Sequence, residues 1–165
     1  MAPETQWATG VADVRAAVAA AVRSATGPAA VGAEGAGGAE GSWGAWVHAV
    51  RLQLPQGLPP VAAGEPELGL AVAALVGHAV RRSRPGARVL VRAVLASGPD
   101  GRPGRVEVRV ADRGASVPGE AAYWASGGVR DRGAVDALVR AGGARFGVEA
   151  TPGGGLTAVL ALPLA

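Results

Sequence analysis

The sequence predicts a two-layer α/β sandwich, in which helices pack on one face of a mixed β-sheet. The predicted elements follow in the order helix, strand, helix, strand, strand, loop, helix, strand, strand, an order that suits this α+β architecture. Of the 165 residues, 49% are hydrophobic, and they are mainly Ala, Val and Leu, so the chain can bury an aliphatic core. This length suits one domain, and we expect residues 1–165 to fold as a single unit.

Residues 11–25, with the sequence VADVRAAVAAAVRSA, form the first predicted helix. Their valines recur at three- and four-residue steps, which places them on one face of a helix, while Arg15 and Arg23 take the other face. Thr9 or Asp13 is expected to cap the N-terminus of this helix.

A loop and a strand are predicted next. Residues 27–42, GPAAVGAEGAGGAEGS, are dominated by Gly, Ala and Glu, and this composition predicts a flexible loop because it buries little apolar surface. Residues 43–55, WGAWVHAVRLQLP, then alternate between two sets of side chains, which predicts a strand with one wet face.

The strongest predicted helix spans residues 67–82 and follows the Pro-rich connector QGLPPVAAGEP. Pro66 and Glu67 suit a helix start, because proline there loses no hydrogen bond that the first turn would make. Its apolar stripe consists of Leu68, Val72, Leu75, Val76 and Ala79.

Two hairpins and a short helix complete the predicted fold. ARVLVRAVLAS and RVEVRVAD are strands separated by GPDGRPG, whose glycines and prolines predict a turn between antiparallel strands. GAVDALVRAGGA predicts a short helix that ends at a glycine pair. RFGVEATPGGGLTAVLALPL predicts a strand, a turn and a final strand.

The composition disfavours several classes of function. All 16 basic residues are Arg and the net charge is only +3, so nucleic-acid binding is disfavoured unless arginines cluster beside reading side chains. The absence of Cys excludes disulfides and Cys-based metal sites. No apolar run reaches the roughly 18 residues of a membrane span, and MAPETQWATG lacks the pattern of a secretory signal. We therefore expect a cytoplasmic protein that does not enter a membrane.

Three segments carry recognisable motifs in a fixed order. They are LQLPQGLPPVAAGEPELGLAVAALVGHAVRRSRPGARVLVRA, VEVRVADRGASVPGE and VEATPGGGLTAVLALPL. Together they resemble the first strand with its Asn-bearing helix, the first glycine box and the last hairpin of the catalytic ATP-binding domain of sensor histidine kinases, a GHKL-type domain. The pattern of residues in these segments is most similar to that of the potassium-responsive sensor kinases. The resemblance implies the Bergerat (histidine-kinase ATPase-like) fold and a role in bacterial signal transduction.

The first glycine box supplies the leading candidate for nucleotide binding. In the resembled family its Asp accepts a hydrogen bond from the adenine amino group, and Asp112 matches that position. Gly114 follows it, as close backbone approach requires, whereas Ser116 replaces the next glycine. The alternative interpretation of Asp112 is a turn-forming residue at a strand end. If Asp112 carries residual binding, Asp112→Asn should weaken it and leave the fold intact.

The positions that serve Mg²⁺ in the resembled family are altered. The family has two Asn residues four positions apart on the helix, and the second Asn holds Mg²⁺; Ala74 and His78 stand there in this chain. Ala74 has no ligand atom, and an imidazole suits Mg²⁺ poorly because this ion prefers hard oxygen ligands. We therefore expect no metal site and interpret His78 as a hydrogen-bonded residue at the edge of the nucleotide pocket.

The second glycine box, which in the family opens a phosphate-holding helix, is also altered. Its counterpart is GGVRDRGAV, where Asp131 would repel phosphate while Arg130 and Arg132 would attract it. A polar surface loop that caps a helix is the favoured interpretation.

The remaining motifs lie near the lid and in the last hairpin. Tyr123 and Trp124 are the candidates for what is left of the phenylalanine box before a short lid. The last glycine segment is intact and matches the family at Gly153, Gly154, Gly155 and Thr157. These residues are candidate nucleotide contacts, and they also suit a plain hairpin turn.

These departures favour a regulatory module over an enzyme. Phosphoryl transfer depends on positioning and charge neutralisation, and the loss of two or three charge-assisted contacts would cost on the order of 10³-fold in ATP affinity. We therefore predict a degenerate domain with no catalytic residues, a histidine-kinase pseudokinase, that binds ATP or ADP weakly, without Mg²⁺. His48 lies in strand-like surroundings unlike those of a phosphoacceptor, so autophosphorylation is not expected.

Such a domain would act as a non-catalytic module that binds another protein. The alternative is a functional ATP-binding protein, an ATPase or a partner-directed kinase of the anti-sigma type, with an altered metal site. Ala74 and His78 discriminate between the two hypotheses and favour the first.

Overall fold

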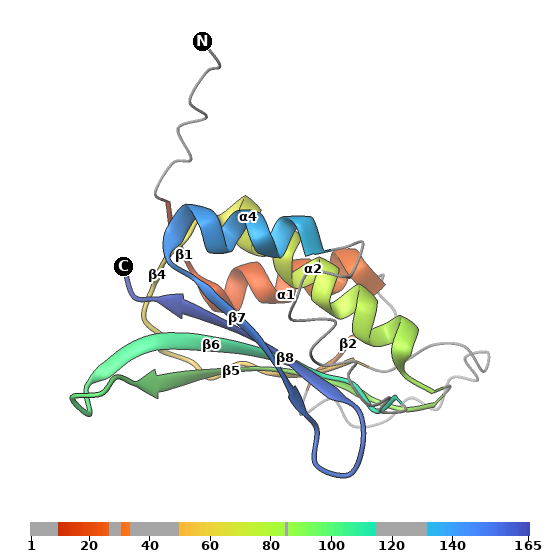
Figure 1. Ribbon diagram of the computed structural model, residues 1–165. Coiled ribbons are helices and arrows are strands. Elements are labelled where there is room, and N and C mark those ends of the chain that lie inside the picture. The colour runs from red at the N-terminus through yellow and green to blue at the C-terminus, as the bar shows by residue number, and fades with distance from the viewer. Residues whose placement is uncertain (1–9, 27–30, 34–49, 85, 115–131) are drawn as a thin grey trace.

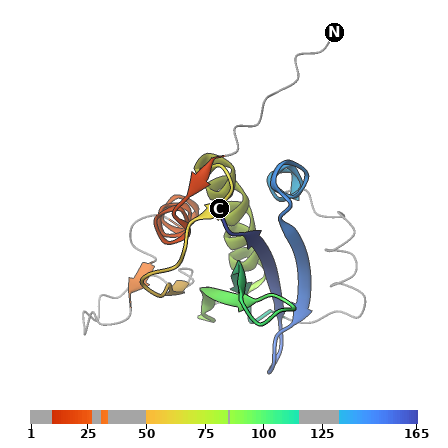
Figure 2. The same cartoon turned by 90° about the vertical axis from the view of Figure 1, so that its left-hand side faces the viewer.

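The described part of the computed structural model is a two-layer sandwich, as predicted. It comprises residues 10–26, 31–33, 50–84, 86–114 and 132–165. Helices α1 (Val14–Thr26), α2 (Glu65–Arg82) and α4 (Gly133–Gly142) cover one face of a mixed sheet (Figure 1). The second view shows α2 in the middle of the helical layer, with α1 on one side and α4 on the other (Figure 2).

The sheet has six strands: β2 (Val31–Ala33), β3 (Val50–Gln53), β5 (Val89–Ser97), β6 (Pro103–Ala111), β7 (Arg145–Ala150) and β8 (Leu156–Pro163). They lie in the order β2-β3-β5-β6-β8-β7. β3 pairs parallel with both of its neighbours, and the remaining pairs are antiparallel. The parallel step from β3 to β5 needs a crossover, which α2 supplies, whereas the two predicted hairpins, β5–β6 and β7–β8, need only turns.

The first helix begins later than predicted. β1 (Val11–Ala12) pairs antiparallel with β4 (Val61–Ala62), which lies inside the predicted Pro-rich connector. Asp13 then starts α1, because its Oδ1 accepts a hydrogen bond from the backbone N–H of Ala16 at 3.1 Å. The spacing of the valines predicted the helix correctly but placed its start too early, since a β-branched residue at position 11 fits a strand as well.

The predicted loop at residues 27–42 contains a strand, so the prediction is wrong for three of its residues. Val31–Ala33 form β2, which pairs with β3 from Val31 opposite Val50 to Ala33 opposite Leu52. An edge strand is held by backbone hydrogen bonds, which need no large side chains, so composition alone does not exclude it. The other residues of this segment, and residues 43–49 of the next predicted strand, lie outside the described residues.

The core lies between the helices and the sheet and is aliphatic. All five residues of the predicted stripe on α2 are buried, as are Val89 and Val91 of β5 and Val106 and Val108 of β6. None of the described helices combines the length and the hydropathy of a membrane span.

Two leucines of α2 provide a test of this packing. Leu68 is fully buried and Leu70 is 65% exposed. We expect Leu68→Ala to lower the free energy of unfolding by about 2–5 kcal/mol, because it leaves a cavity beneath the helix. Leu70→Ala should change it by less than about 0.5 kcal/mol. Denaturant titration of both variants measures the difference, and equal losses would contradict the orientation of α2.

Candidate functional site

The predicted site residues meet where β6 ends, β8 begins and α2 ends. Asp112 directly follows β6 and is only 3% exposed. Its Oδ1 accepts hydrogen bonds from the backbone N–H of Gly114 at 3.0 Å and of Leu156 at 3.1 Å. Its Oδ2 accepts a hydrogen bond from Nε of Arg82 at 3.0 Å. One carboxylate therefore joins three segments that are distant in the sequence.

Arg82 is a site residue that the sequence analysis did not identify. It lies in the last turn of α2, where a cation is favoured by the helix dipole, and its side chain is 13% exposed. The ion pair with Asp112 is therefore largely removed from water, and a charge left there without its partner would be costly. Only the basic last turn of the helix hints at this pairing in the sequence.

Two of the predicted glycines are required by the packing of the chain itself. A Cβ at Gly114 would lie 2.7 Å from the carbonyl oxygen of Arg82. A Cβ at Gly155, where φ is +97°, would overlap the carbonyl oxygen of Asp112. Both glycines thus bring backbone close to the Asp112 junction, whether or not a nucleotide is bound.

The two other glycines of the last segment form the turn between β7 and β8. Gly153 has φ +86° and Gly154 has φ +109°, backbone conformations that other residues rarely adopt. The carbonyl oxygen of Pro152, next to them, accepts a hydrogen bond from Arg113 at 3.2 Å. The hairpin interpretation accounts for both glycines without a ligand.

A small cavity lies beside Asp112, between α2 and the sheet. Its volume is about 10 Å³, room for about one water molecule, whereas ligand pockets usually measure about 300–1,000 Å³. Asp112 and His78 do meet here, as the family motifs imply, but the cavity does not admit a purine ring. The lining residues are Leu75, His78, Ala79, Val110, Asp112, Val148, Leu156 and Ala158.

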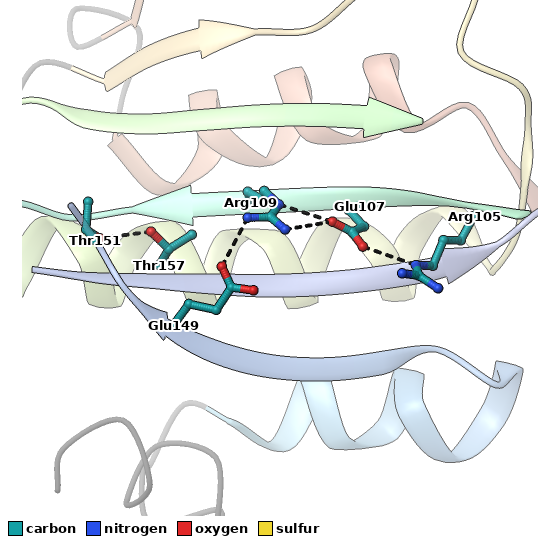
Figure 3. Close-up of polar contacts among 6 residues, drawn as sticks. All are labelled: Arg105, Glu107, Arg109, Glu149, Thr151 and Thr157. Carbon is teal, nitrogen blue, oxygen red and sulfur yellow. Dashed lines mark hydrogen bonds and ion pairs between the residues drawn. The ribbon is translucent and has the colours of Figure 1, made fainter. Parts of the chain in front are cut away.

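Leu156 lines this cavity, and the candidate residue Thr157 does not. Successive side chains of a strand point to opposite faces, so Leu156 points inward with Ala158 and Leu160, while Thr157 points away from the helices. There its Oγ1 lies 2.8 Å from Oγ1 of Thr151 (Figure 3). The sheet therefore separates Thr157 from Asp112. The regular alternation of inward and outward side chains on β8, with its leucines inward, would have predicted that Thr157 points away from the helices.

The residues at the family's metal position do not fit Mg²⁺. Ala74 and His78 lie one turn apart on α2, and together they provide one imidazole and no oxygen ligand. In the described ranges, no three His, Cys, Asp or Glu residues gather in a way that could hold a metal ion.

The start of α4 shows how part of the second glycine box is used. Nε of Arg132 donates a hydrogen bond to Oδ1 of Asp136 at 2.8 Å, and the guanidinium lies 4.8 Å from the ring centre of Phe146 on β7. Arg132 thus ties α4 to the sheet. His48, which the sequence analysis interpreted as a strand residue and not a phosphoacceptor, lies outside the described residues. So do the other residues of this region, of the first glycine box and of the lid: Ser116, Tyr123, Trp124, Gly127, Gly128, Arg130 and Asp131.

Comparison with known proteins identifies the fold. No family model matches the sequence, and no curated protein matches it. The mycobacterial sensor histidine kinase MprB superposes with a TM-score of 0.65 at 19% identity, over 94% of this chain and 97% of that one. The catalytic domain of histidine kinase ThkA gives a TM-score of 0.61 at 10% identity, over 94% and 95% of the two chains. Full-length ShkA, solved in complex with AMPPNP, gives 0.66 at 19% identity, over 97% of this chain and 32% of ShkA.

The chain therefore has the fold of a histidine-kinase ATP-binding domain, and the GHKL-type fold implied by the sequence motifs is confirmed. At these identities the likeness shows the fold alone. The closer similarity to potassium-responsive kinases stays a prediction.

Gly155→Ala tests the close approach at the Asp112 junction. We expect it to lower the free energy of unfolding by on the order of 3–5 kcal/mol, because positive-φ strain adds to overlap with the Asp112 carbonyl. Gly57 is a matched control, since it has φ +76° but nothing within 4 Å of an added Cβ. Gly57→Ala should cost only the strain, about 1–2 kcal/mol. Equal losses would show that nothing crowds Gly155.

Asp112→Asn tests the buried ion pair, and the structure changes the earlier expectation that this variant leaves the fold intact. We expect a loss of on the order of 3 kcal/mol in the free energy of unfolding, because Arg82 loses the buried carboxylate with which it is paired at 3.0 Å. Asp136→Asn is the control, as it breaks a more exposed pair worth about 0.5 kcal/mol or less. Thermal or denaturant unfolding measures the stability of both variants. If Asp112→Asn is no less stable than Asp136→Asn, the ion pair between Arg82 and Asp112 does not stabilise the fold as we infer.

Proposed function

We propose that the chain is a non-catalytic histidine-kinase-like module of the bacterial cytoplasm, which regulates signalling by binding another protein. The observation that carries the proposal is the small size of the cavity that the described residues leave at Asp112, about 10 Å³. A domain that keeps the fold of an ATP-binding domain but lacks space for the base suits a scaffold better than a kinase.

The hydrogen bonds of Asp112 support weak nucleotide binding at most. An ionised carboxylate offers about four lone-pair sites, and Gly114, Leu156 and Arg82 already occupy three of them. An adenine amino group would have to bind beside the Arg82 cation. It would also have to displace Leu156, which is 6% exposed, at a cost of about 1.5–3 kcal/mol for the lost apolar burial.

The phosphate and metal positions support the same proposal. Ala74 provides no metal ligand, and the guanidinium of Arg132 is already engaged by Asp136 and Phe146. Phosphoryl transfer depends on metal ions and donors that neutralise the developing charge. The described residues supply neither a site for the metal nor an unengaged cation at the start of α4.

The competing function is an ATP-dependent enzyme, and one observation favours it. Asp112 and His78 line the same cavity, in the arrangement that the family motifs imply. Nucleotide binding would then require Leu156 and Val148 to move away from α2, which would expose buried apolar surface.

Calorimetric titration with ATP and ADP, with and without Mg²⁺, decides between the two functions. We expect dissociation constants no tighter than on the order of 100 μM, without an effect of Mg²⁺, because the cavity at Asp112 is small and the metal ligand is missing. ShkA, solved with AMPPNP, serves as the positive control. Tight, Mg²⁺-dependent binding by the natural sequence would overturn the proposal.

The double variant Ala74→Asn with His78→Asn separates the two causes of weak binding. It restores the family's two amide side chains but leaves Leu156 in the cavity. We expect no gain in affinity for Mg²⁺ and ATP from it, because the cavity remains closed. A strong gain would show that the missing metal ligand, and not the closed cavity, limits binding.

A further inference from the structure

The sheet face that points away from the helices, here called the open face, carries all the charge of the sheet. Val91, Val108 and Val110 point into the core, so their neighbours Arg92 and Arg109 point outward, and cross-strand pairing places these two arginines opposite each other. The same alternation places every charged residue of the six strands on the open face: Arg51, Arg92, Arg105, Glu107, Arg109, Arg145 and Glu149. Five arginines against two glutamates leave an excess of three positive charges.

Part of this charge is organised as a ladder across the strands. Glu107 accepts hydrogen bonds from Arg105 at 3.1 Å and from Arg109 at 2.9 Å, and Arg109 also donates to Glu149 at 3.1 Å (Figure 3). Burial raises the pKa of Glu107, but the hydrogen bonds from Arg109 and Arg105 outweigh it, so its pKa lies below the usual range. Glu107 is thus ionised at neutral pH and fixes the position of both arginines.

A hollow of about 430 Å³ lies at the end of this ladder, within the size range of ligand sites. It is lined by Arg92, Arg109, Arg113, Glu149, Thr151 and Thr157, together with small and apolar residues. The cavity at Asp112 is on the other side of the sheet, so the two sites are separate.

The hollow presents hydrogen-bond donors that are not used within the described residues. Within the described ranges Arg92 is exposed and makes no ion pair. Arg113 donates one hydrogen bond, to the carbonyl oxygen of Pro152. Each guanidinium has five N–H donors, so both keep most of their capacity. In the pair between Thr151 and Thr157, one hydroxyl donates to the other, which leaves the second hydroxyl hydrogen available. These groups suit a carboxylate.

The remaining features of the open face favour an acidic peptide over a nucleic acid. Glu107 and Glu149 alternate with the arginines, so a continuous phosphate backbone would meet repulsion along the ladder, whereas spaced carboxylates would not. Among the described residues the open face also lacks an aromatic side chain for base stacking, since Phe146 packs against the core and Arg132.

We propose that the open face is the docking surface for an acidic segment of a protein partner, with one carboxylate of that segment seated in the hollow between Arg92 and Arg113. This proposal rests on the proposed function, because it gives the partner of the regulatory module its chemistry. The excess positive charge steers the segment to the face, and the ladder sets its register.

The test uses a fluorescein-labelled peptide of ten glutamates and fluorescence anisotropy at low ionic strength. We expect Arg92→Gln with Arg113→Gln to weaken binding about tenfold or more, since two cationic contacts are lost. The matched control is Arg15→Gln with Arg23→Gln, which removes the same charge from exposed positions of α1 in the helical layer. The control should change binding less than about twofold. Equal weakening by both pairs would overturn the proposal, because it would show attraction by net charge alone.

Two further measurements keep the outcome clear. Arg92→Gln alone breaks no ion pair within the described residues, so it should weaken binding without changing thermal unfolding; an unaltered affinity would overturn the proposal. A labelled oligonucleotide of ten thymidines that binds more tightly than the peptide, and depends on the same arginines, would assign the face to nucleic acid instead. Tight binding of ATP would refute the proposed function but not the docking site, so the two failures are distinguishable.

Discussion

The ion pair between Arg82 and Asp112 is the contact on which the arrangement of the described residues depends. It joins the end of α2 to the junction of β6 and β8, beside a mainly aliphatic core. A charge at this depth has to be paired, and the backbone amides of Gly114 and Leu156 complete the pairing. The same contact supports the proposed function, because a carboxylate that holds the two layers together has little capacity left for a ligand.

This double role supports the proposal that this chain keeps the motif without the activity. A glycine box can persist as a structural junction after the space for a nucleotide has closed, because Asp112, Gly114 and Gly155 are needed by the packing itself. The fold of a histidine-kinase ATP-binding domain is therefore compatible with a protein that does not handle ATP. The charged side chains on the open face of the sheet are one feature through which such a domain could act.

The sequence was sufficient to predict the long helix and the two hairpins, but not to predict the contacts within the candidate site. The stripe on α2 and the alternating strands of the two hairpins bury enough apolar surface to define those elements locally. β2 and the β1–β4 pair escaped prediction because short strands depend on backbone partners that are distant in the sequence. For the same reason little in the sequence indicated that Arg82 pairs with Asp112, and the motif match did not reveal which face of β8 carries Thr157.

We infer that the carboxylate of Asp112 serves the fold and not a nucleotide. Amide resonances of Gly114 and Leu156, whose N–H groups both donate to Asp112, report on it directly in a two-dimensional NMR spectrum. With a large excess of ATP and Mg²⁺, both resonances should keep their chemical shifts and both amides their protection from hydrogen exchange. Large shifts at these two amides, or loss of their protection when ATP is added, would contradict the account.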